Sequence, residues 1–267
     1  MILRVATFNL WSGRGRDGEV EVSRLVAAAR ALAAAGADVL AVQEVDRDQP
    51  RSAGVDQLAV VAQAFGAVDA RFCPTVSGVP GPGHGWTPVT DDREVAGPTY
   101  GIGLVSRVPV RGWRVRRLRG SRAVLPVGVP RASGRGVRVL WVPDEPRAAL
   151  SAVVDGGSGP VTVIATHLSF APPAAVRQLR AVRRWADSLP GPRVLAGDLN
   201  LPGGVPARVT GWRSLARAST FPAESPRVQL DHVLTDAGSS LARGPGGATL
   251  LLPVSDHRAL ISADVTM

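Results

Sequence analysis

The sequence predicts a layered α/β or α+β fold in a single domain that spans residues 1–267. Apolar runs alternate with segments of helical periodicity, which is the pattern of sheets covered by helices. Polar residues that can bind a cation or move a proton stand at the ends of the apolar runs. The hydrophobic content of 45% is enough for one sizeable core.

Three segments have the spacing of amphipathic helices. Val20–Ala35 places its apolar residues on one stripe, and Gly36 follows as a stop signal. Val55–Phe65 predicts a second helix, and Ala174–Leu189 predicts a third behind the start signal of Pro172–Pro173.

Glycine, proline and short polar residues mark the connections. Ser77–Pro98 and Leu201–Pro226 read as loops, and we expect them to shape a pocket. The motifs "PRASGRG" and "DGGSGP" predict hairpin turns between strands in the middle of the chain. The motif "YGIGL" lacks the strand–loop–helix context of a nucleotide site, so it carries no such prediction.

Composition excludes several classes of protein. Cys73 is the only cysteine, which excludes an intramolecular disulfide framework and a cysteine zinc cluster. The start "MILRVATFNLW" lacks the ordered parts of a signal peptide, and Arg30 and Asp38 interrupt the most apolar long window. We therefore expect a cytoplasmic protein without a transmembrane segment. Nothing indicates a protein partner, and we expect a monomer.

The net charge of +9 favours an anionic partner only weakly. All 31 basic residues are arginines in a chain rich in alanine, glycine, proline and valine, a bias that a GC-rich coding background produces whatever the function. The densest stretch, Arg111–Arg122, holds six arginines and Trp113. It fits a track for a phosphate backbone, although the charged solvent face of an edge strand is the favoured interpretation.

The apolar runs end on carboxylates, amides and imidazoles. Near-continuous apolar runs are typical of strands buried on both faces, and their carboxyl ends meet at one rim of a sheet. We therefore expect a polar cluster at that rim. Its members are Asn9, Glu44, His167, Asp198 with Asn200, Asp231 with His232, and Asp256 with His257.

Such a cluster, without cysteine, favours an oxygen-ligated cation, Mg²⁺ or Mn²⁺. Glu44 is the best candidate for a direct ligand. Histidines in this setting hydrogen-bond a phosphoryl group or transfer protons. The combination suits attack of water on a phosphate ester, with a cation on the phosphate and a base on the water.

At this point the chain resembles the endonuclease/exonuclease/phosphatase superfamily, which has the DNase-I-like fold. The motifs "TFNLW", "VQEV", "YGIGLVSR", "ATHLS", "GDLN", "LDHVL" and "SDHRAL" occur in the family's order and cover Thr7 to Leu260. The resemblance implies a four-layer sandwich, with two packed mixed β-sheets flanked by helices. It also implies metal-dependent hydrolysis of phosphate esters, most favourably a phosphodiester, with nucleic acid as one possible substrate.

The resemblance also implies a role for each matching position. Metal ligands are Glu44, helped by Asn9, and Asp256. The catalytic group comprises Asp198 on the attacking water, Asn200 and His167 on the phosphate, and His257 paired with Asp231. Tyr100 resembles a catalytic or site-shaping residue, and Arg147 a substrate-binding one.

The sequence departs from the patterns of two subfamilies, and neither subfamily is therefore supported. Trp11 stands where many DNA-repair members carry an aspartate, and "SPRVQL" before Asp231 lacks the inositol-phosphatase signature. The alternatives left open are a phosphomonoesterase, a lipid phosphodiesterase, or a non-catalytic module that binds anions.

Some residues also have a plain structural interpretation. Asn9 alone is as consistent with a turn as with a ligand, and His167 is consistent with a satisfied buried histidine. His232 follows Asp231, so on a strand it points to the opposite face and is expected to be structural. His84, inside a glycine- and proline-rich loop, fits a lid over the site, although a plain exposed histidine is the favoured interpretation.

Overall fold

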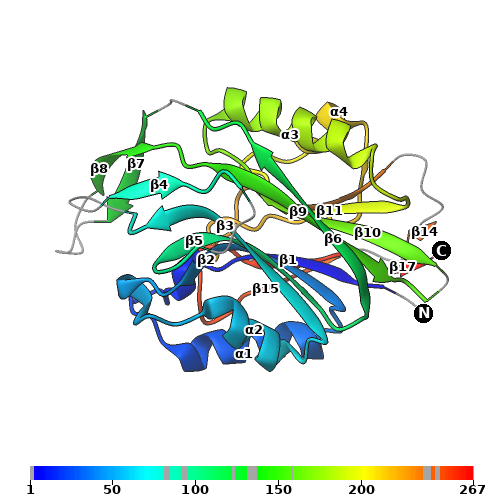
Figure 1. The fold of residues 1–267 in the computed structure, drawn as a ribbon, viewed down its shortest axis with the longest axis horizontal. Helices are drawn as coiled ribbons and strands as arrows, with labels where there is room; N and C mark the ends of the chain where they lie inside the picture. The colour runs from blue at the N-terminus through cyan, green and yellow to red at the C-terminus, as the bar shows by residue number, and fades with distance from the viewer. Residues whose placement is uncertain are drawn as a thin grey trace.

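Two large β-sheets pack face to face in the computed structural model, with helices on both outer faces (Figure 1). The structure describes residues 3–80, 85–91, 95–121, 124–130, 137–157, 159–236, 242–243 and 247–266. The predicted four-layer sandwich of two mixed sheets is confirmed. His84 lies outside the described residues.

The first sheet has seven strands, and its only parallel pair among the described strands is β1 with β2. In spatial order its strands are β15 (Ala248–Leu250), β16 (Ala259–Ile261), β1 (Val5–Asn9), β2 (Val39–Arg47), β5 (Thr99–Ser106), β3 (Asp69–Gly78) and β4 (Trp86–Pro88).

The second sheet has six strands, with β10 parallel to β11 and its other pairs antiparallel. Its strands in spatial order are β12 (Arg213–Ser214), β13 (Asp231–Thr235), β11 (Arg193–Asp198), β10 (Pro160–His167), β9 (Arg147–Asp155) and β6 (Val110–Leu118). Two small antiparallel pairs complete the strands: β7 (Val124–Pro130) with β8 (Val137–Pro143), and β14 (Ala242–Arg243) with β17 (Val265–Thr266).

All three predicted helices are present. They are α1 (Val22–Ala34), α2 (Gln57–Phe65) and α3 (Pro172–Ala186); α3 begins two residues early because proline is tolerated in the first helical turn. A short helix, α4 (Val205–Thr210), and 3₁₀ turns at Trp11–Gly13 and Pro50–Ser52 complete the set. Within the described ranges, no helix combines the length and apolar character needed to cross a membrane.

Alternation along the strands builds three apolar layers. Val5, Val163 and Val194 point between the sheets. The even-numbered residues Ala6 and Phe8 face α1 and α2, and Ile164 faces α3. Each sheet is therefore covered on both faces, as the near-continuous apolar runs predict.

Several predicted boundaries were wrong. Strand β2 continues past Glu44 to Arg47, and β13 begins at Asp231 rather than ending there. The predicted loop Leu201–Pro226 contains α4 and β12, and Ser77–Pro98 contains β4. These elements are shorter than the periodicity windows used to detect helices and strands in sequence.

The predicted hairpins join antiparallel partners. Gly156 N–H donates to the carbonyl of Gly159 at the turn between β9 and β10. Strands β7 and β8 pair across the motif "PRASGRG", whose residues 131–136 lie outside the described part of the chain.

Candidate active site

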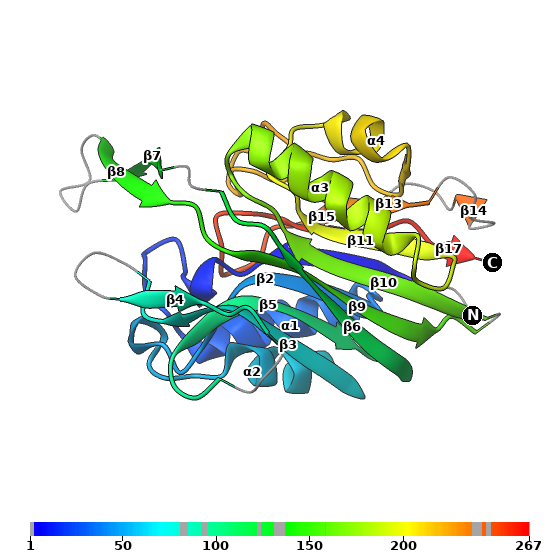
Figure 2. The same cartoon turned by 45° about the horizontal axis from the view of Figure 1, so that its top comes forward.

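Polar side chains from both sheets meet where the parallel strands end. Strand β1 runs away from the end of the molecule where the two chain termini lie, so the site is at the other end of the sandwich (Figures 1 and 2). Asn9, His167 and Asp198 each continue the alternation that points Val5, Val163 and Val194 between the sheets. Their side chains therefore converge in the space between the two sheets.

Asn9 connects the two sheets. Its Nδ2 donates to Oε1 of Glu44 at 3.0 Å and to Oδ2 of Asp198 at 3.1 Å, while its Oδ1 accepts from the Trp11 amide at 2.9 Å. The side chain is buried, so these bonds fix the relative positions of two carboxylates from different sheets. Asn9 therefore both forms the predicted turn contact and lies among the predicted site residues.

Glu44 reaches the site through a β-bulge. By strict alternation it would share the outer face of Leu40 and Val42. The register between β2 and β5 shifts between Val42 and Val45, and Glu44 has a φ of 54°. A bulge re-aims a side chain in this way, at the cost of left-handed backbone at a glutamate.

Burial raises the pKa of Glu44 to about 7, against the opposing hydrogen bond from Asn9 and with a smaller contribution from the nearby carboxylates Asp256 and Glu145. Asp256 is half-buried in the loop before β16, and burial raises its pKa too. Negative charge thus accumulates here, a situation that a bound cation relieves.

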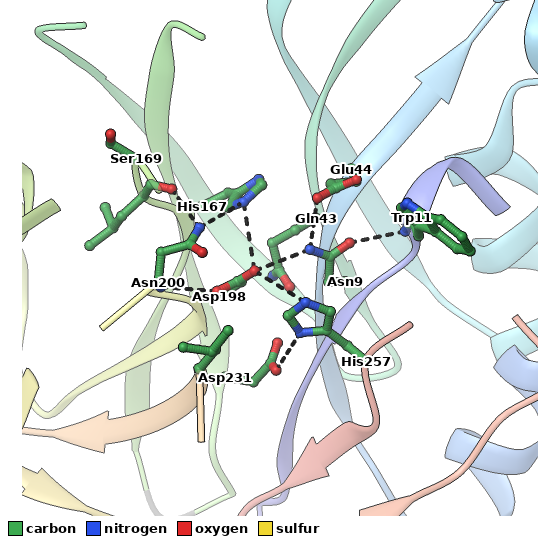
Figure 3. Close-up of polar contacts among 12 residues, drawn as sticks. Asn9, Trp11, Gln43, Glu44, His167, Ser169, Asp198, Asn200, Asp231 and His257 are labelled. Carbon is green, nitrogen blue, oxygen red and sulfur yellow. Dashed lines mark hydrogen bonds and ion pairs between the residues drawn. The ribbon is translucent and has the colours of Figure 1, made fainter. Parts of the chain in front are cut away.

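Asp198 lies at the centre of the cluster (Figure 3). Its Oδ2 is 3.7 Å from Nε2 of His167 and 3.9 Å from Nε2 of His257. Burial raises the pKa of Asp198 to about 6 despite the opposing charge of His257. Such a carboxylate is poised to accept a proton near neutral pH.

Asn200 is held by backbone geometry rather than by strand extension. Its φ is 49°, and its N–H donates to Oδ1 of Asp198 at 2.9 Å, so Asp198 and Asn200 form a turn just after β11. Its Nδ2 donates to the carbonyl of Leu168 at 3.0 Å and lies 3.3 Å from Nε2 of His167.

His257 and Asp231 form a buried ion pair. Nδ1 of His257 is 2.8 Å from Oδ2 of Asp231. Burial alone would lower the pKa of His257, but the carboxylates of Asp231 and Asp198 outweigh it and raise that pKa to about 10. Asp231 is at the site because β13 is antiparallel to β11, so that its first residue lies opposite Asp198.

His167 has a different neighbour. Its Nδ1 is 2.9 Å from Nη1 of Arg147, the first residue of β9, and Arg147 in turn lies 3.6 Å from the carboxylate of Glu145. Burial and the charge of Arg147 lower the pKa of His167 well below its usual range. Tyr100 is buried beside these charges, and burial followed by the charge of Glu44 raises its pKa.

The ligand atoms of Asp198, Asp231 and His257 lie within 4.8 Å of one another and could in principle hold a metal ion. Two of them are already bonded to each other, and a protonated imidazole has no lone pair for a cation. The carboxylates of Glu44 and Asp256 are chemically better suited, since burial and then nearby carboxylates disfavour their negative charge, which a cation would neutralise.

Two residues near the site were missed from the sequence. Glu145 precedes Arg147 in the motif "EPRAAL" but has no strand-end position of its own. The ring of Phe221 lies 4.9 Å from that of His257, and it comes from a segment predicted only as loop. A charged pair just ahead of a buried strand is the one signal that could have identified Glu145.

The arginine-rich stretch Arg111–Arg122 includes an edge strand with a charged solvent face, as the favoured interpretation predicts. Strand β6 is the edge of the second sheet, and Arg114 and Arg116 are exposed on it while Val115 packs inward. His232 is buried, with Nε2 2.9 Å from the carbonyl of Leu201, so it is a satisfied histidine on the opposite face of β13.

A family model described as "Endonuclease/Exonuclease/phosphatase family" matches residues 6–257. No curated protein sequence matches the chain significantly. Among solved structures, an endonuclease/exonuclease/phosphatase from Beutenbergia cavernae DSM 12333 is 25% identical with a TM-score of 0.70, over 99% of this chain and 71% of the other.

Two further structures share the fold at lower identity. A mannosyl-6-phosphatase from Bacteroides thetaiotaomicron VPI-5482 is 16% identical, with a TM-score of 0.64, over 99% of this chain and 100% of the other. A sphingomyelinase C from Streptomyces griseocarneus is 18% identical, with a TM-score of 0.58, over 100% of both chains.

Proposed function

The chain belongs to the endonuclease/exonuclease/phosphatase family, and from this premise we propose that it is a divalent-metal-dependent phosphoesterase that hydrolyses phosphodiesters by attack of water. One observation supports this most directly. The amide of Asn9 bonds to both Glu44 and Asp198, while His257 lies beside Asp198 in an ion pair with Asp231. A cation-binding carboxylate, a base and a charged imidazole thus share one small volume.

The residues present fit Mg²⁺ or Mn²⁺. The donor set is carboxylate and amide oxygen without sulphur, and burial, followed by neighbouring carboxylates, raises the pKa of Glu44. Glu44 and Asp256 would hold the ion. Asn9 would orient Glu44, because its Nδ2 donates a hydrogen bond to that carboxylate. Its Oδ1 accepts one hydrogen bond from Trp11 and keeps a second lone pair. A bound ion would neutralise phosphate charge and polarise the phosphorus–oxygen bond.

The chain's own groups would divide the remaining work. Asp198, with a pKa near 6, would orient the attacking water and accept its proton. His257, protonated through its pair with Asp231, would place positive charge against the developing negative charge on phosphate. His167 and Asn200 would donate hydrogen bonds to phosphate oxygens, and Tyr100 would shape the pocket wall.

A substrate panel tests the proposal. We expect hydrolysis of bis(p-nitrophenyl) phosphate, a diester, to exceed that of p-nitrophenyl phosphate, a monoester, and to require Mg²⁺ or Mn²⁺. Double-stranded DNA, sphingomyelin and a sugar phosphate extend the panel to the other phosphate esters. Asp198→Ala should lower kcat by about a hundredfold to ten-thousandfold, the usual contribution of a general base.

The control is Asp155→Asn. Asp155 pairs with Arg111 on the exposed end of β9, so its loss should leave activity unchanged. Turnover that persists in excess chelator, or an Asp198→Ala protein as active as the control, would contradict the proposal. Faster monoester than diester hydrolysis would reassign the substrate class to phosphomonoesters.

A further inference from the structure

The two histidines of the site have opposite hydrogen-bond partners. Nδ1 of His257 faces the carboxylate of Asp231, which can only accept, whereas Nδ1 of His167 faces the guanidinium of Arg147 at 2.9 Å. An arginine side chain has five donors, no acceptor, and a pKa above the range in which it could lose its proton. Nδ1 of His167 must therefore be the acceptor, with its lone pair directed at Arg147.

This contact fixes the chemical form of His167. A ring whose Nδ1 accepts carries its single proton on Nε2 and is neutral. Arg147 is itself held: its exposed fraction is 5%, and the carboxylates of Glu145 and Asp144 lie 3.6 and 3.9 Å from its guanidinium. The arginine is thus fixed behind the ring, and it acts on the site through His167.

The opposite edge of the ring meets a second donor. Nε2 lies 3.3 Å from Nδ2 of Asn200, which already donates one hydrogen to the carbonyl of Leu168. Since both nitrogens carry hydrogen, this contact is not a hydrogen bond. Asp198 Oδ2, at 3.7 Å, is beyond hydrogen-bond distance, and no acceptor within the described part of the chain satisfies Nε2–H.

Two neighbouring N–H donors without an acceptor form a binding place for an anionic oxygen. We propose that Arg147 is a positioning residue that holds His167 neutral with its proton on Nε2, so that His167 and Asn200 donate together to one non-bridging phosphate oxygen and His167 transfers no proton. The inference rests on the proposed function and assigns a specific part of it. The low pKa of His167 agrees with it.

The form of the ring can be measured without any turnover. Long-range ¹H–¹⁵N spectra of histidine-labelled protein distinguish the two neutral tautomers and the cation, and loss of signals in His167→Gln assigns the ring. We expect the Nε2–H tautomer from about pH 5 to 9, without titration. Addition of inorganic phosphate should shift the Nε2 resonance. An Nδ1–H tautomer, a ring that titrates in this range, or no response to phosphate would overturn the proposal.

Activity then separates donation from proton transfer. Glutamine offers an N–H donor but has no titratable proton, so His167→Gln should keep kcat within about tenfold, whereas His257→Gln should lose about a hundredfold or more. Equal losses would show that the His167 ring does more than donate. The tautomer spectra stand even if no phosphoesterase activity is found, so the two proposals can fail separately.

Arg147 needs its own test, since a buried arginine also stabilises the fold. In Arg147→Met the His167 ring should no longer be restricted to the Nε2–H tautomer, so that Nδ1–H and cationic forms appear. The substitution should also raise KM more than it lowers kcat. Arg147→Lys keeps a donor at Nδ1 and should restore the Nε2–H form in part. If Arg147→Lys is folded and its His167 ring is no more fixed than in Arg147→Met, the positioning role is wrong.

Discussion

Individual side chains in this site differ in function because their hydrogen-bond partners differ. The buried carboxylate of Asp231 bonds to His257 through Oδ2, while its Oδ1 has no hydrogen-bond partner among the described residues. An unsatisfied buried carboxylate oxygen lowers the stability of the fold. The benefit that offsets this cost is the positive charge that Asp231 stabilises on His257. The pair is therefore better explained by function than by stability.

Asp231→Asn tests that explanation. A neutral amide does not stabilise the positive charge on His257. It can also donate its N–H to Nδ1, which would leave the ring neutral with its proton on Nε2. We expect kcat to fall by about a hundredfold or more with little change in KM, by analogy with other carboxylate–histidine pairs. Steady-state kinetics with Mg²⁺ on the diester substrate give both constants.

Asp236→Asn is the matched control, because Asp236 lies on the same stretch of chain as Asp231. Asp236 follows β13 and pairs with Arg193 at 3.0 Å, away from His257. Its loss should leave kcat within about twofold, since ion pairs of this kind contribute little to the geometry of a distant site. Comparable kinetic losses in both variants would mean that the effect of Asp231→Asn is structural.

At the scale of elements, the strand ends explain how much of the site could be predicted. Asn9, His167 and Asp198 each stand at the last position of a buried strand, so alternation alone places them on the inter-sheet face. Glu44 was predicted as a site residue, but its direction depends on a bulge that forms against β5. The predicted hairpin turn pairs β9 with β10, but the contact of Arg147 with His167 lies at the opposite ends of those two strands, where no local pattern identifies it.

Gly197 allows two of these strands to pack closely. Strands β10 and β11 pass so close that a Cβ at Gly197 would lie 2.0 Å from the carbonyl oxygen of Thr166, beside both His167 and Asp198. Gly197→Ala should therefore displace the strand ends. We expect a loss of roughly 1–3 kcal/mol in the free energy of unfolding, as for other overpacked sites, together with a clear loss of kcat. Urea unfolding and kinetics on the folded fraction measure the two effects.

Gly112 on the edge strand β6 provides the comparison. A Cβ there meets nothing within 4 Å among the described atoms, so Gly112→Ala should leave stability and kcat nearly unchanged. If Gly197→Ala behaved like Gly112→Ala, close strand packing could not be what positions His167 and Asp198.

At the scale of the whole molecule, the site lies across the interface of the two sheets. Asn9 and Glu44 belong to the first sheet, whereas His167, Asp198 and Asp231 belong to the second. The apolar layer between the sheets therefore sets the distance between the proposed metal-binding side and the proposed catalytic side. This arrangement also concentrates carboxylates in a buried place, which couples the charge of the site to global stability.

That coupling predicts how stability depends on pH without metal. Glu44 has a pKa of about 7 in the fold and an ordinary value of 4.5 when unfolded. Between these values the folded state binds more protons, so the free energy of unfolding should fall as pH rises. Urea titrations in chelator should show a steeper fall from about pH 5 to 7.5 for wild type than for Glu44→Gln, which has no proton to lose. Comparing variants cancels the opposing titration of other groups, such as His167.

Addition of Mg²⁺ or Mn²⁺ should offset this loss, because the ion replaces the proton at Glu44. At a concentration a hundred times Kd, the gain is about 2.7 kcal/mol for an ion that binds only the folded state. Glu224→Gln removes an exposed carboxylate that pairs with Arg16, and it should behave like wild type in both experiments. Equal pH slopes in wild type and Glu44→Gln, or equal stabilisation of both by the ion, would place the cation somewhere other than Glu44. The proposed metal site at Glu44 would then have to be abandoned.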